Sequence, residues 1–291
     1  MAALGMPQLL HSKSSEKNKS ERTIFITGGA RGIGFQTAIE FANNGDNIVL
    51  YDIANQINSV PYKLSSKQNL DNAQKHIESL GVKCLAIQGD VRKPEALKSA
   101  VESCVAKFGS IDVLIANAAV TAWADVGDIS EKIINDMLAI NVAGVIHSVQ
   151  AVTPYFKEQN YGRVICMSSI AGRAGAFKFS LYAATKWAVI GFAKTVAMEL
   201  GQYNVTCNCI CPTSINTNML NNTHMGTVFG KPDDPRQASE DYFRSIHALP
   251  AGVLEPNEIS QTIKFLCSAE ATKITGSVID VDAGVVAGNN A

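Results

Sequence analysis

Short apolar runs alternate with longer helical stretches over most of this chain, and this alternation constrains the fold more than any other feature. The runs are apolar almost throughout, as in strands that helices cover on both faces. They lie at residues 23–27, 47–52, 82–88, 111–117, 162–168, 204–211 and 276–282. Repeated strand–helix alternation predicts an α/β fold in which a seven-stranded, parallel, doubly wound sheet is flanked by helices.

Helical patterns fill most of the intervals between these runs. The first helix continues to about Asn43, and others are expected at 67–80, 94–108, 130–159, 181–200 and 257–268. Two segments fit neither pattern: residues 53–66 lengthen the connection after the second strand, and residues 213–250 are too long for a simple connection. Because both follow the carboxyl ends of strands, where open α/β sheets bind ligands, 213–250 is predicted to form a substrate lid.

The composition and the N-terminal segment exclude several classes of protein. Residues 1–22 are polar and charged without the features of a signal peptide, so they are predicted to be a disordered extension before one domain at 23–291. The net charge of −1 gives no basic field for nucleic acid. No run approaches the 18 apolar residues of a membrane-spanning helix, so no membrane partner is expected.

The seven cysteines do not resemble a secreted disulfide framework, which predicts a reduced, cytoplasmic protein. Cys207, Cys209 and Cys211 alternate along a predicted strand and should share one of its faces. Three thiols in a line are a poor start for tetrahedral metal coordination. Buried thiols are therefore favoured over a metal cluster, and no metal is predicted.

The glycine-rich stretch "TGGARGIG" (27–34) follows the first strand and opens the first helix. Gly28 allows a sharp turn, Gly32 lets the backbone approach a phosphate, and Gly34 permits close packing of helix on strand. The N-terminus of the helix offers N–H groups and a positive dipole to a pyrophosphate. The spacing is G-x-x-x-G-x-G rather than the commoner G-x-G-x-x-G.

Asp52 ends the second strand, 18 residues after Gly34. A carboxylate at this place can accept hydrogen bonds from an adenosine ribose and would repel a 2′-phosphate. Arg31 favours NADP instead, because a cation in the glycine loop could bind that phosphate. The two residues together favour NAD over NADP.

Tyr182 and Lys186 lie four residues apart in the helical stretch "LYAATKW". A phenol is a poor base at neutral pH, and a cation one helical turn away can stabilise its phenolate. The pair alone is equally compatible with an ordinary helix surface, so its meaning depends on the rest of the chain.

A complete set of motifs occurs in one order along the chain: the glycine loop, Asn117 in "IANAA", Asn141 in "INVAG", Ser169 in "MSSIAG" and Tyr182-x-x-x-Lys186. Over residues 23–284 this set resembles the short-chain dehydrogenase/reductase family, which implies a Rossmann-like fold and an NAD-dependent oxidoreductase. The resemblance makes Tyr182 the acid/base, with Lys186, Ser169 and Asn141 in support.

The resemblance also implies the contacts with cofactor and substrate. The expected cofactor-binding residues are Gly28, Arg31, Gly32, Ile33, Gly34, Asp52, Asp90, Val91, Asn117, Tyr182, Lys186, Pro212, Ile215 and Thr217. The expected substrate residues are Ser169, Tyr182, Trp123, Phe177 and Met219. Two departures put local loop geometry in doubt: "ANAA" (116–119) replaces Asn-Asn-Ala-Gly, and Thr213 replaces a glycine after Pro212.

A finer resemblance rests on residues 52–70 and 243–260, which are similar to carveol dehydrogenases and mycofactocin-associated dehydrogenases. In that group the insertion covers a tightly held cofactor, and the substrates are often cyclic secondary alcohols. The implied reaction interconverts an apolar, cyclic, terpenoid-like alcohol and its ketone. The helices at 130–159 and 181–200 imply a homotetramer. An NADPH-dependent ketone reductase, a non-redox cyclase or isomerase, and an NAD sensor are the alternatives.

Overall fold

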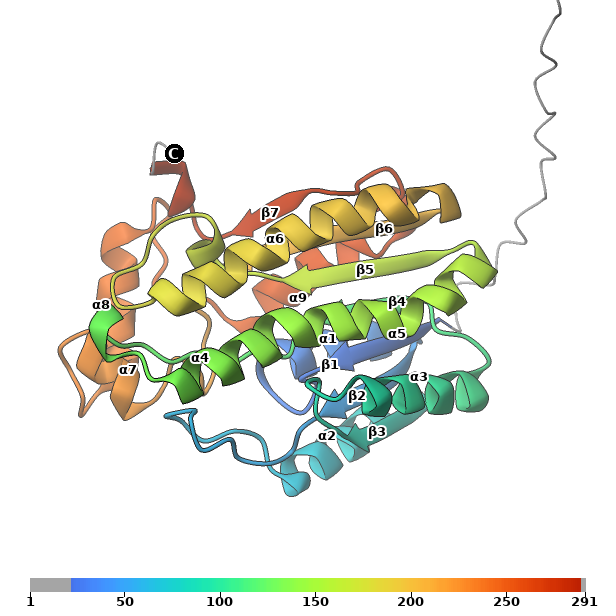
Figure 1. The fold of residues 1–291 in the computed structure, drawn as a ribbon, viewed down its shortest axis with the longest axis horizontal. Coiled ribbons are helices and arrows are strands. Elements are labelled where there is room, and N and C mark those ends of the chain that lie inside the picture. The colour runs from blue at the N-terminus through green and yellow to red at the C-terminus, as the bar shows by residue number, and fades with distance from the viewer. Residues whose placement is uncertain (1–21, 289–291) are drawn as a thin grey trace, which may run out of the picture.

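A seven-stranded parallel sheet runs through the computed structural model, which describes residues 22–288 (Figure 1). The strand order is β3-β2-β1-β4-β5-β6-β7. The strands are β1 (Thr23–Thr27), β2 (Asn47–Asp52), β3 (Cys84–Gln88), β4 (Val113–Ala116), β5 (Gly162–Met167), β6 (Val205–Pro212) and β7 (Val278–Val281). The chain order reverses between β1 and β4, and such a switch point is where open α/β sheets bind ligands.

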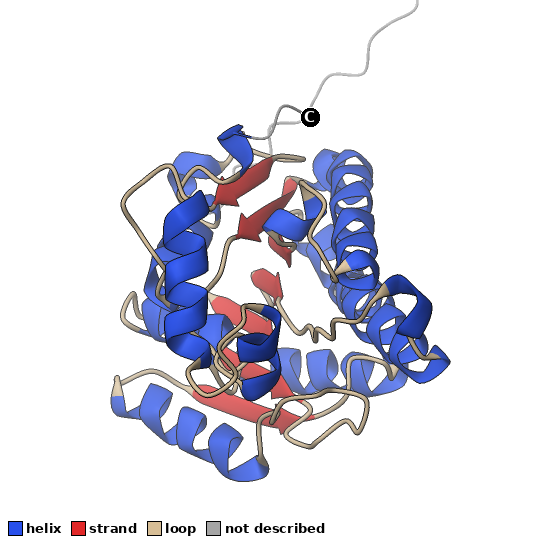
Figure 2. Ribbon diagram, turned by 90° about the vertical axis from the view of Figure 1, so that its left-hand side faces the viewer, coloured by secondary structure: helices blue, strands red, loops and turns tan. Residues whose placement is uncertain are grey.

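Helices cover both faces of the sheet, as the view from the carboxyl ends of the strands shows (Figure 2). One hydrophobic layer packs beneath α3 (Pro94–Phe108), α5 (Gly144–Gln159) and α6 (Ser180–Leu200). The other packs beneath α1 (Gly32–Ala42), α2 (Lys67–Ser79) and α9 (Pro256–Leu266). The remaining helices are α4 (Glu131–Met137), α7 (Thr223–Val228) and α8 (Pro235–Ile246). Figure 1 shows α7 and α8 beyond the carboxyl ends of the strands.

Local sequence signals account for several helix ends. Ser66 and Asn69 form a reciprocal capping box at the start of α2. Pro94 occupies the first turn of α3, where its missing N–H costs nothing, and Gly109 ends that helix at φ +81°. All residues of β1 and β6 are buried, as strands covered on both faces require.

The predicted sheet and flanking helices are confirmed, with differences at the edges of elements. The strands expected from residues 82 and 111 begin later, at Cys84 and Val113. The helix expected over 130–159 contains a π-helical turn, Leu138–Ala143, between α4 and α5. The predicted lid segment, 213–250, contains α7 and α8, which were not predicted. The expected N-terminal extension lies outside the described residues, apart from Arg22.

Within residues 22–288, one helical segment, Glu131–Gln159, is long and apolar enough to cross a membrane by length and composition alone. In its most apolar window 44% of the residues are buried inside the protein. α5 forms part of the core over the sheet, and a core helix of this kind has the same composition. The absence of a membrane partner therefore stays a prediction.

The cysteines of β6 lie as the alternation predicts. Cys207, Cys209 and Cys211 are buried in the same hydrophobic layer and carry free thiols. Burial raises the pKa of Cys211 to about 12. Among the described residues there is no cluster of three or more His, Cys, Asp or Glu side chains suited to a metal ion.

Candidate active site

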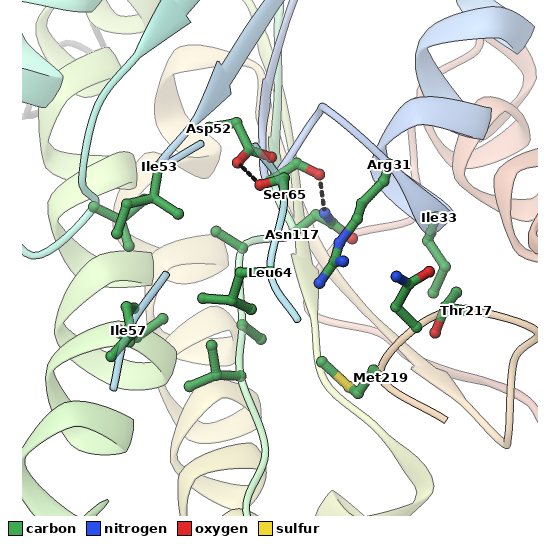
Figure 3. A pocket seen from close by; sticks show the side chains of 18 of the residues that line it. Arg31, Ile33, Asp52, Ile53, Ile57, Leu64, Ser65, Asn117, Thr217 and Met219 are labelled. Atoms are coloured by element: carbon green, nitrogen blue, oxygen red, sulfur yellow. Dashed lines mark hydrogen bonds between the residues drawn. The ribbon is translucent and has the colours of Figure 1, made fainter. Parts of the chain in front are cut away.

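A cavity of about 260 Å³ opens at the carboxyl ends of β1, β2 and β4, where the strand order reverses (Figure 3). The residues after β3, the 53–66 insertion and the start of the 213–250 segment complete its walls. Among the residues expected to contact cofactor or substrate, it is lined by Gly28, Arg31, Gly32, Ile33, Asp52, Asp90, Val91, Asn117, Thr217 and Met219. The structure thus gathers into one site side chains that are up to 191 residues apart in sequence.

The glycine loop has the geometry that its spacing predicts. Gly28 has φ +68°, and the amide of Asn117 donates to the carbonyl oxygens of Thr27 (2.9 Å) and Gly28 (3.1 Å). A Cβ on Gly34 would lie 2.3 Å from the Gly28 oxygen, so only glycine lets α1 approach this closely. No side chain caps the first turn of α1, whose N–H groups are therefore available to an anion.

Asp52 is 5% exposed and is held by three donors. One carboxylate oxygen accepts from the N–H of Ala30 (3.0 Å), and the other accepts from the N–H of Ala54 (3.0 Å) and from the hydroxyl of Ser65. Four lone-pair sites on a carboxylate leave capacity for a further donor. The predicted ribose-reading residue is thus a pre-positioned negative charge in the cavity wall (Figure 3).

Arg31 is tied to the insertion. Its Nη1 donates to the carbonyl oxygen of Lys63 at 2.7 Å, and burial lowers the pKa of its guanidinium below the usual value. The side chain lies beside the cavity together with Asp52 (Figure 3). This hydrogen bond gives Arg31 a role in closing the insertion that does not depend on a 2′-phosphate.

Gln56 holds the insertion in shape. Its amide donates to the carbonyl oxygens of Ile57 (3.2 Å), Val60 (3.3 Å) and Tyr62 (3.2 Å). Its oxygen accepts from the N–H of Leu64 at 2.9 Å. One side chain therefore satisfies four backbone groups of a segment that has no helix or strand of its own.

A hydrogen bond and two ion pairs connect the insertion to α4. The hydroxyl of Ser59 donates to Asp136 at 2.5 Å, and Arg92 bridges Asp136 (2.7 Å) and Asp90 (2.6 Å). The hydrogen bond from Ser59, with the charges of Lys132 and Arg92, holds the pKa of Asp136 below its usual range. Asp90, expected to contact the adenine, lines the cavity with its carboxylate bound to Arg92.

Ser168 and Ser169 have different surroundings, although they are adjacent after β5. The hydroxyl of Ser168 donates to the carbonyl oxygen of Lys186 at 2.9 Å and so belongs to the packing of α6. Ser169 begins the turn Ile170–Gly172, and its hydroxyl accepts from the N–H of Ala171 at 3.2 Å. The same hydroxyl is near enough to the phenol of Tyr182 to lower the pKa of that phenol against the larger, opposite effect of burial. Ser169, rather than Ser168, is therefore the serine beside Tyr182.

Burial changes the acidity of both members of the Tyr182–Lys186 pair. Lys186 is 2% exposed, its Nζ donates to the carbonyl oxygen of Met167 (2.8 Å), and it lies 5.5 Å from the centre of the Tyr182 ring. Loss of hydration lowers the pKa of Lys186 to about 8 and raises the pKa of Tyr182 to about 12. At neutral pH the phenol is consequently protonated and able to donate.

Asn141 lies in the π-helical turn and is fully buried. Its side-chain oxygen accepts from the N–H of Val120 (2.9 Å), and its amide donates to the carbonyl oxygen of Val120 (2.8 Å) and to the hydroxyl of Thr185 (3.2 Å). This side chain joins the loop after β4 to the helix that carries Tyr182 and Lys186. Sequence reasoning predicted the position of Asn141 but not these partners.

The residues expected to contact the substrate are placed unequally. Met219 lines the cavity (Figure 3). The ring of Trp123 packs against the rings of Phe179 and of His224 in α7, with ring centres 6.0 Å and 5.2 Å apart. The ring of Phe179, the N-cap residue of α6, also contacts that of Tyr182, with 6.2 Å between the ring centres, and this contact was not predicted from the sequence. Phe177 is 81% exposed and does not line the cavity, so its role stays a prediction.

The loop after β6 explains the departure at Thr213. Nδ1 of His247 donates to the carbonyl oxygen of Ala251 at 2.8 Å, and its Nε2 is hydrogen-bonded to the Thr213 hydroxyl at 2.9 Å. The threonine therefore ties this loop to the end of α8. Pro212 ends β6 and Ile215 pairs with Leu254; neither lines the cavity, in contrast to Thr217.

Comparisons with known proteins agree with this geometry. The family model described as short chain dehydrogenase matches residues 22–226. The (-)-trans-carveol dehydrogenase of Rhodococcus erythropolis is 34% identical over 264 residues, which cover 89% of this chain and 95% of that protein. The 3-oxoacyl-[acyl-carrier-protein] reductase of Thermotoga maritima is 34% identical over 266 residues, covering 91% of this chain and 98% of that protein.

Solved structures extend the likeness to three dimensions. The carveol dehydrogenase of Mycobacterium avium, determined in complex with NAD, has a TM-score of 0.88 at 32% identity and covers 91% of this chain and 98% of its own. The resemblance inferred from the motifs is confirmed, including its likeness to carveol dehydrogenases. The sheet topology, the glycine loop and the extended sequence match together show that the chain belongs to the short-chain dehydrogenase family.

Proposed function

We propose that this protein is an NAD-dependent oxidoreductase that interconverts a secondary alcohol and its ketone, with Tyr182 as the acid/base. The observation that carries the proposal is the placement of the Ser169 hydroxyl beside the buried phenol of Tyr182, with Nζ of Lys186 5.5 Å from the centre of the Tyr182 ring. A hydroxyl donor, a phenol and a buried cation are the groups needed to bind an alcohol oxygen and move its proton.

The cavity fits a dinucleotide in its donors and acceptors. The uncapped N-terminus of α1 suits a pyrophosphate, and Asp52 suits a ribose with free hydroxyls. Tyr51 lines the same cavity, and its hydroxyl is buried without a hydrogen-bond partner among the described residues. NAD bound as its cofactor supplies hydride chemistry to this site.

The chain's own residues have separable roles in the proposed reaction. Tyr182 exchanges a proton with the substrate oxygen, which Ser169 holds by a second hydrogen bond. Lys186, protonated below its pKa of about 8, favours the phenolate that forms when Tyr182 gives up its proton. Asn141 positions α6 relative to the loop after β4 through Thr185 and Val120.

The proposed substrate is a cyclic, terpenoid-like secondary alcohol. The likeness to carveol dehydrogenases supports this class, as does the apolar surface of Trp123 and Met219 on the catalytic side. Phe177 is proposed to join them when substrate binds. The likeness to a 3-oxoacyl reductase favours a second candidate, an NADPH-dependent ketone reductase, which the negative charge of Asp52 opposes.

The direct test follows nicotinamide absorbance while purified protein is incubated with carveol and related cyclic alcohols, each with added NAD. Steady production of NADH is expected from an ordinary dehydrogenase. A single burst that matches the enzyme concentration would mean that the cofactor is trapped and requires an external acceptor. Product without a change in absorbance would identify a non-redox cyclase or isomerase, and NAD binding without any product would identify a sensor.

Asp52→Asn should reduce the preference for NAD over NADP about ten- to a hundredfold, equivalent to about 1.4–2.8 kcal/mol. The amide keeps the size of the side chain but removes the charge that repels a 2′-phosphate. The ratio of the two dissociation constants, measured by fluorescence titration with NADH and NADPH, checks this. Asp71→Asn, at an exposed carboxylate of α2, is the matched control. An unchanged ratio would assign ribose recognition to another residue.

We further propose a cytoplasmic homotetramer in which α5 and α6 pack against other copies of the chain. The outer surface of α6 supports this, because Trp187 is 49% exposed and Met198 is 84% exposed. Light scattering during size-exclusion chromatography measures the oligomeric state. Trp187→Glu should lower the measured mass if α6 is in the interface, whereas a monomeric wild type would contradict the proposal.

A further inference from the structure

Tyr62 is a buried tyrosine that the insertion brings to the cofactor cavity. Its side chain is 5% exposed and lines the cavity, while its carbonyl oxygen accepts from Gln56 at 3.2 Å. Its phenolic oxygen accepts from the N–H of Thr121, in the loop after β4, at 3.2 Å. Tyr62 thus joins the insertion to the loop that leads toward Trp123, and both its backbone and its ring are held in place.

Two hydroxyl groups at this junction have hydrogen-bonding capacity left over. The O–H of Tyr62 donates to no acceptor among the described residues, because its recorded bond uses the oxygen as acceptor. The hydroxyl of Thr121 is buried and has no partner among them either, but Thr121 does not line the cavity. Unsatisfied buried hydroxyls cost free energy and are uncommon in native proteins, so a polar group of a ligand is the expected partner of the Tyr62 O–H.

The position of Tyr62 along the cavity follows from its neighbours. Ser65, three residues after Tyr62, bonds to Asp52 at the ribose-reading end. Thr121, which bonds to the Tyr62 oxygen, adjoins Val120, and Asn141 holds Val120 beside the catalytic helix. Tyr182 and Arg31 both influence the acidity of Tyr62, whose pKa burial raises far above its usual value. Tyr62 therefore lies between the Asp52 end and the catalytic tyrosine.

We propose that the hydroxyl of Tyr62 forms a hydrogen-bonding subsite for an oxygen atom of NAD beyond its adenosine, so that the insertion contributes a cofactor-binding residue as well as a cover. This inference rests on the proposed NAD function. The Tyr62 hydroxyl donates to the ligand oxygen, while its own oxygen keeps the bond from the N–H of Thr121. The ligand oxygen is of the kind carried by a phosphate or by the second ribose.

Tyr62→Phe tests the subsite, and Thr121→Val is its neighbouring control. The first keeps the ring but removes the phenolic oxygen; the second removes only the Thr121 hydroxyl, outside the cavity, and leaves its N–H to bond Tyr62. Tyr62→Phe should accelerate release of NADH about three- to tenfold, as expected for loss of one hydrogen bond, and Thr121→Val should leave it unchanged. The rate is read from the fall in bound NADH fluorescence after mixing with excess NAD. Tyr203→Phe, at a phenol away from the cavity, should match the wild type.

Binding of AMP separates a ligand contact from a looser insertion. AMP carries the adenosine end alone, so both variants should bind it as the wild type does. Equal weakening of AMP and NADH would overturn the subsite and leave Tyr62 as a fastening of the insertion. Unchanged release of NADH in Tyr62→Phe would overturn it as well. A wild-type protein that binds neither NADH nor NAD would instead refute the proposed function, on which the subsite depends.

Discussion

Tyr182→Phe should lower turnover about 10²–10⁴-fold, the usual contribution of a positioned general acid or base. Phenylalanine preserves the ring, its contact with Phe179 and the packing of α6, and removes only the group that exchanges a proton with the substrate. Tyr182 was expected to contact the cofactor but does not line the cavity, so the dissociation constant for NADH should stay within about twofold. Initial rates and fluorescence titration on the same preparation measure the two quantities.

The control for Tyr182→Phe is Tyr155→Phe, which removes a phenol from α5, outside the cavity and away from Ser169. It should retain wild-type turnover. If Tyr182→Phe retained turnover within a few-fold of the wild type, another residue would have to move the proton. Loss of turnover together with loss of NADH binding would show damage to the fold rather than removal of the acid/base.

Lys186→Met should change the pH dependence of stability as well as remove most of the activity. Burial lowers the pKa of Lys186 to about 8 from a usual 10.5, so between these pH values the unfolded chain binds more protons than the folded protein. Lys186 should therefore raise the free energy of unfolding as pH increases through this range, by about 3 kcal/mol in full. This rise is a difference between wild type and variant, since the buried cysteines, whose pKa burial raises, lower the stability of both above about pH 9. Methionine has no proton to lose, so the variant should lack this rise.

Urea unfolding at pH 7.5 and pH 9.5 tests the direction of this effect. The free energy of unfolding of the wild type, relative to that of Lys186→Met, should be larger at pH 9.5 than at pH 7.5. The range stops below pH 10 because the raised pKa of Tyr182 acts in the opposite direction above it. Lys194→Met, at an exposed lysine of the same helix, should run parallel to the wild type. Parallel curves for Lys186→Met would mean that Lys186 is hydrated in the folded protein.

The layout of the sheet and the main chemical groups could be predicted because their signals are local or have fixed spacing. Strands buried on both faces are continuous apolar runs. The role of Gly34 could be predicted because a close approach of helix and strand leaves no room for a side chain. Ser169 was distinguished from Ser168 by its spacing from Tyr182, and the structure gives Ser168 a separate bond to Lys186. The π-helical turn around Asn141 changes hydrogen bonding within a helix without changing its apolar pattern, so its bounds were not readable.

By itself, the sequence determined the parallel sheet, the glycine loop and the order of Ser169, Tyr182 and Lys186, because each depends on residues that are neighbours along a strand, a turn or a helix. Only the tertiary structure decided that the Ser65 hydroxyl bonds to Asp52 and that the Thr121 N–H bonds to Tyr62. It also left Phe177 exposed. The insertion that supplies Ser65 and Tyr62 has no periodic pattern, since neither a helix nor a strand forms there. Its conformation depends on hydrogen bonds to residues distant in the chain, and no local pattern encodes these.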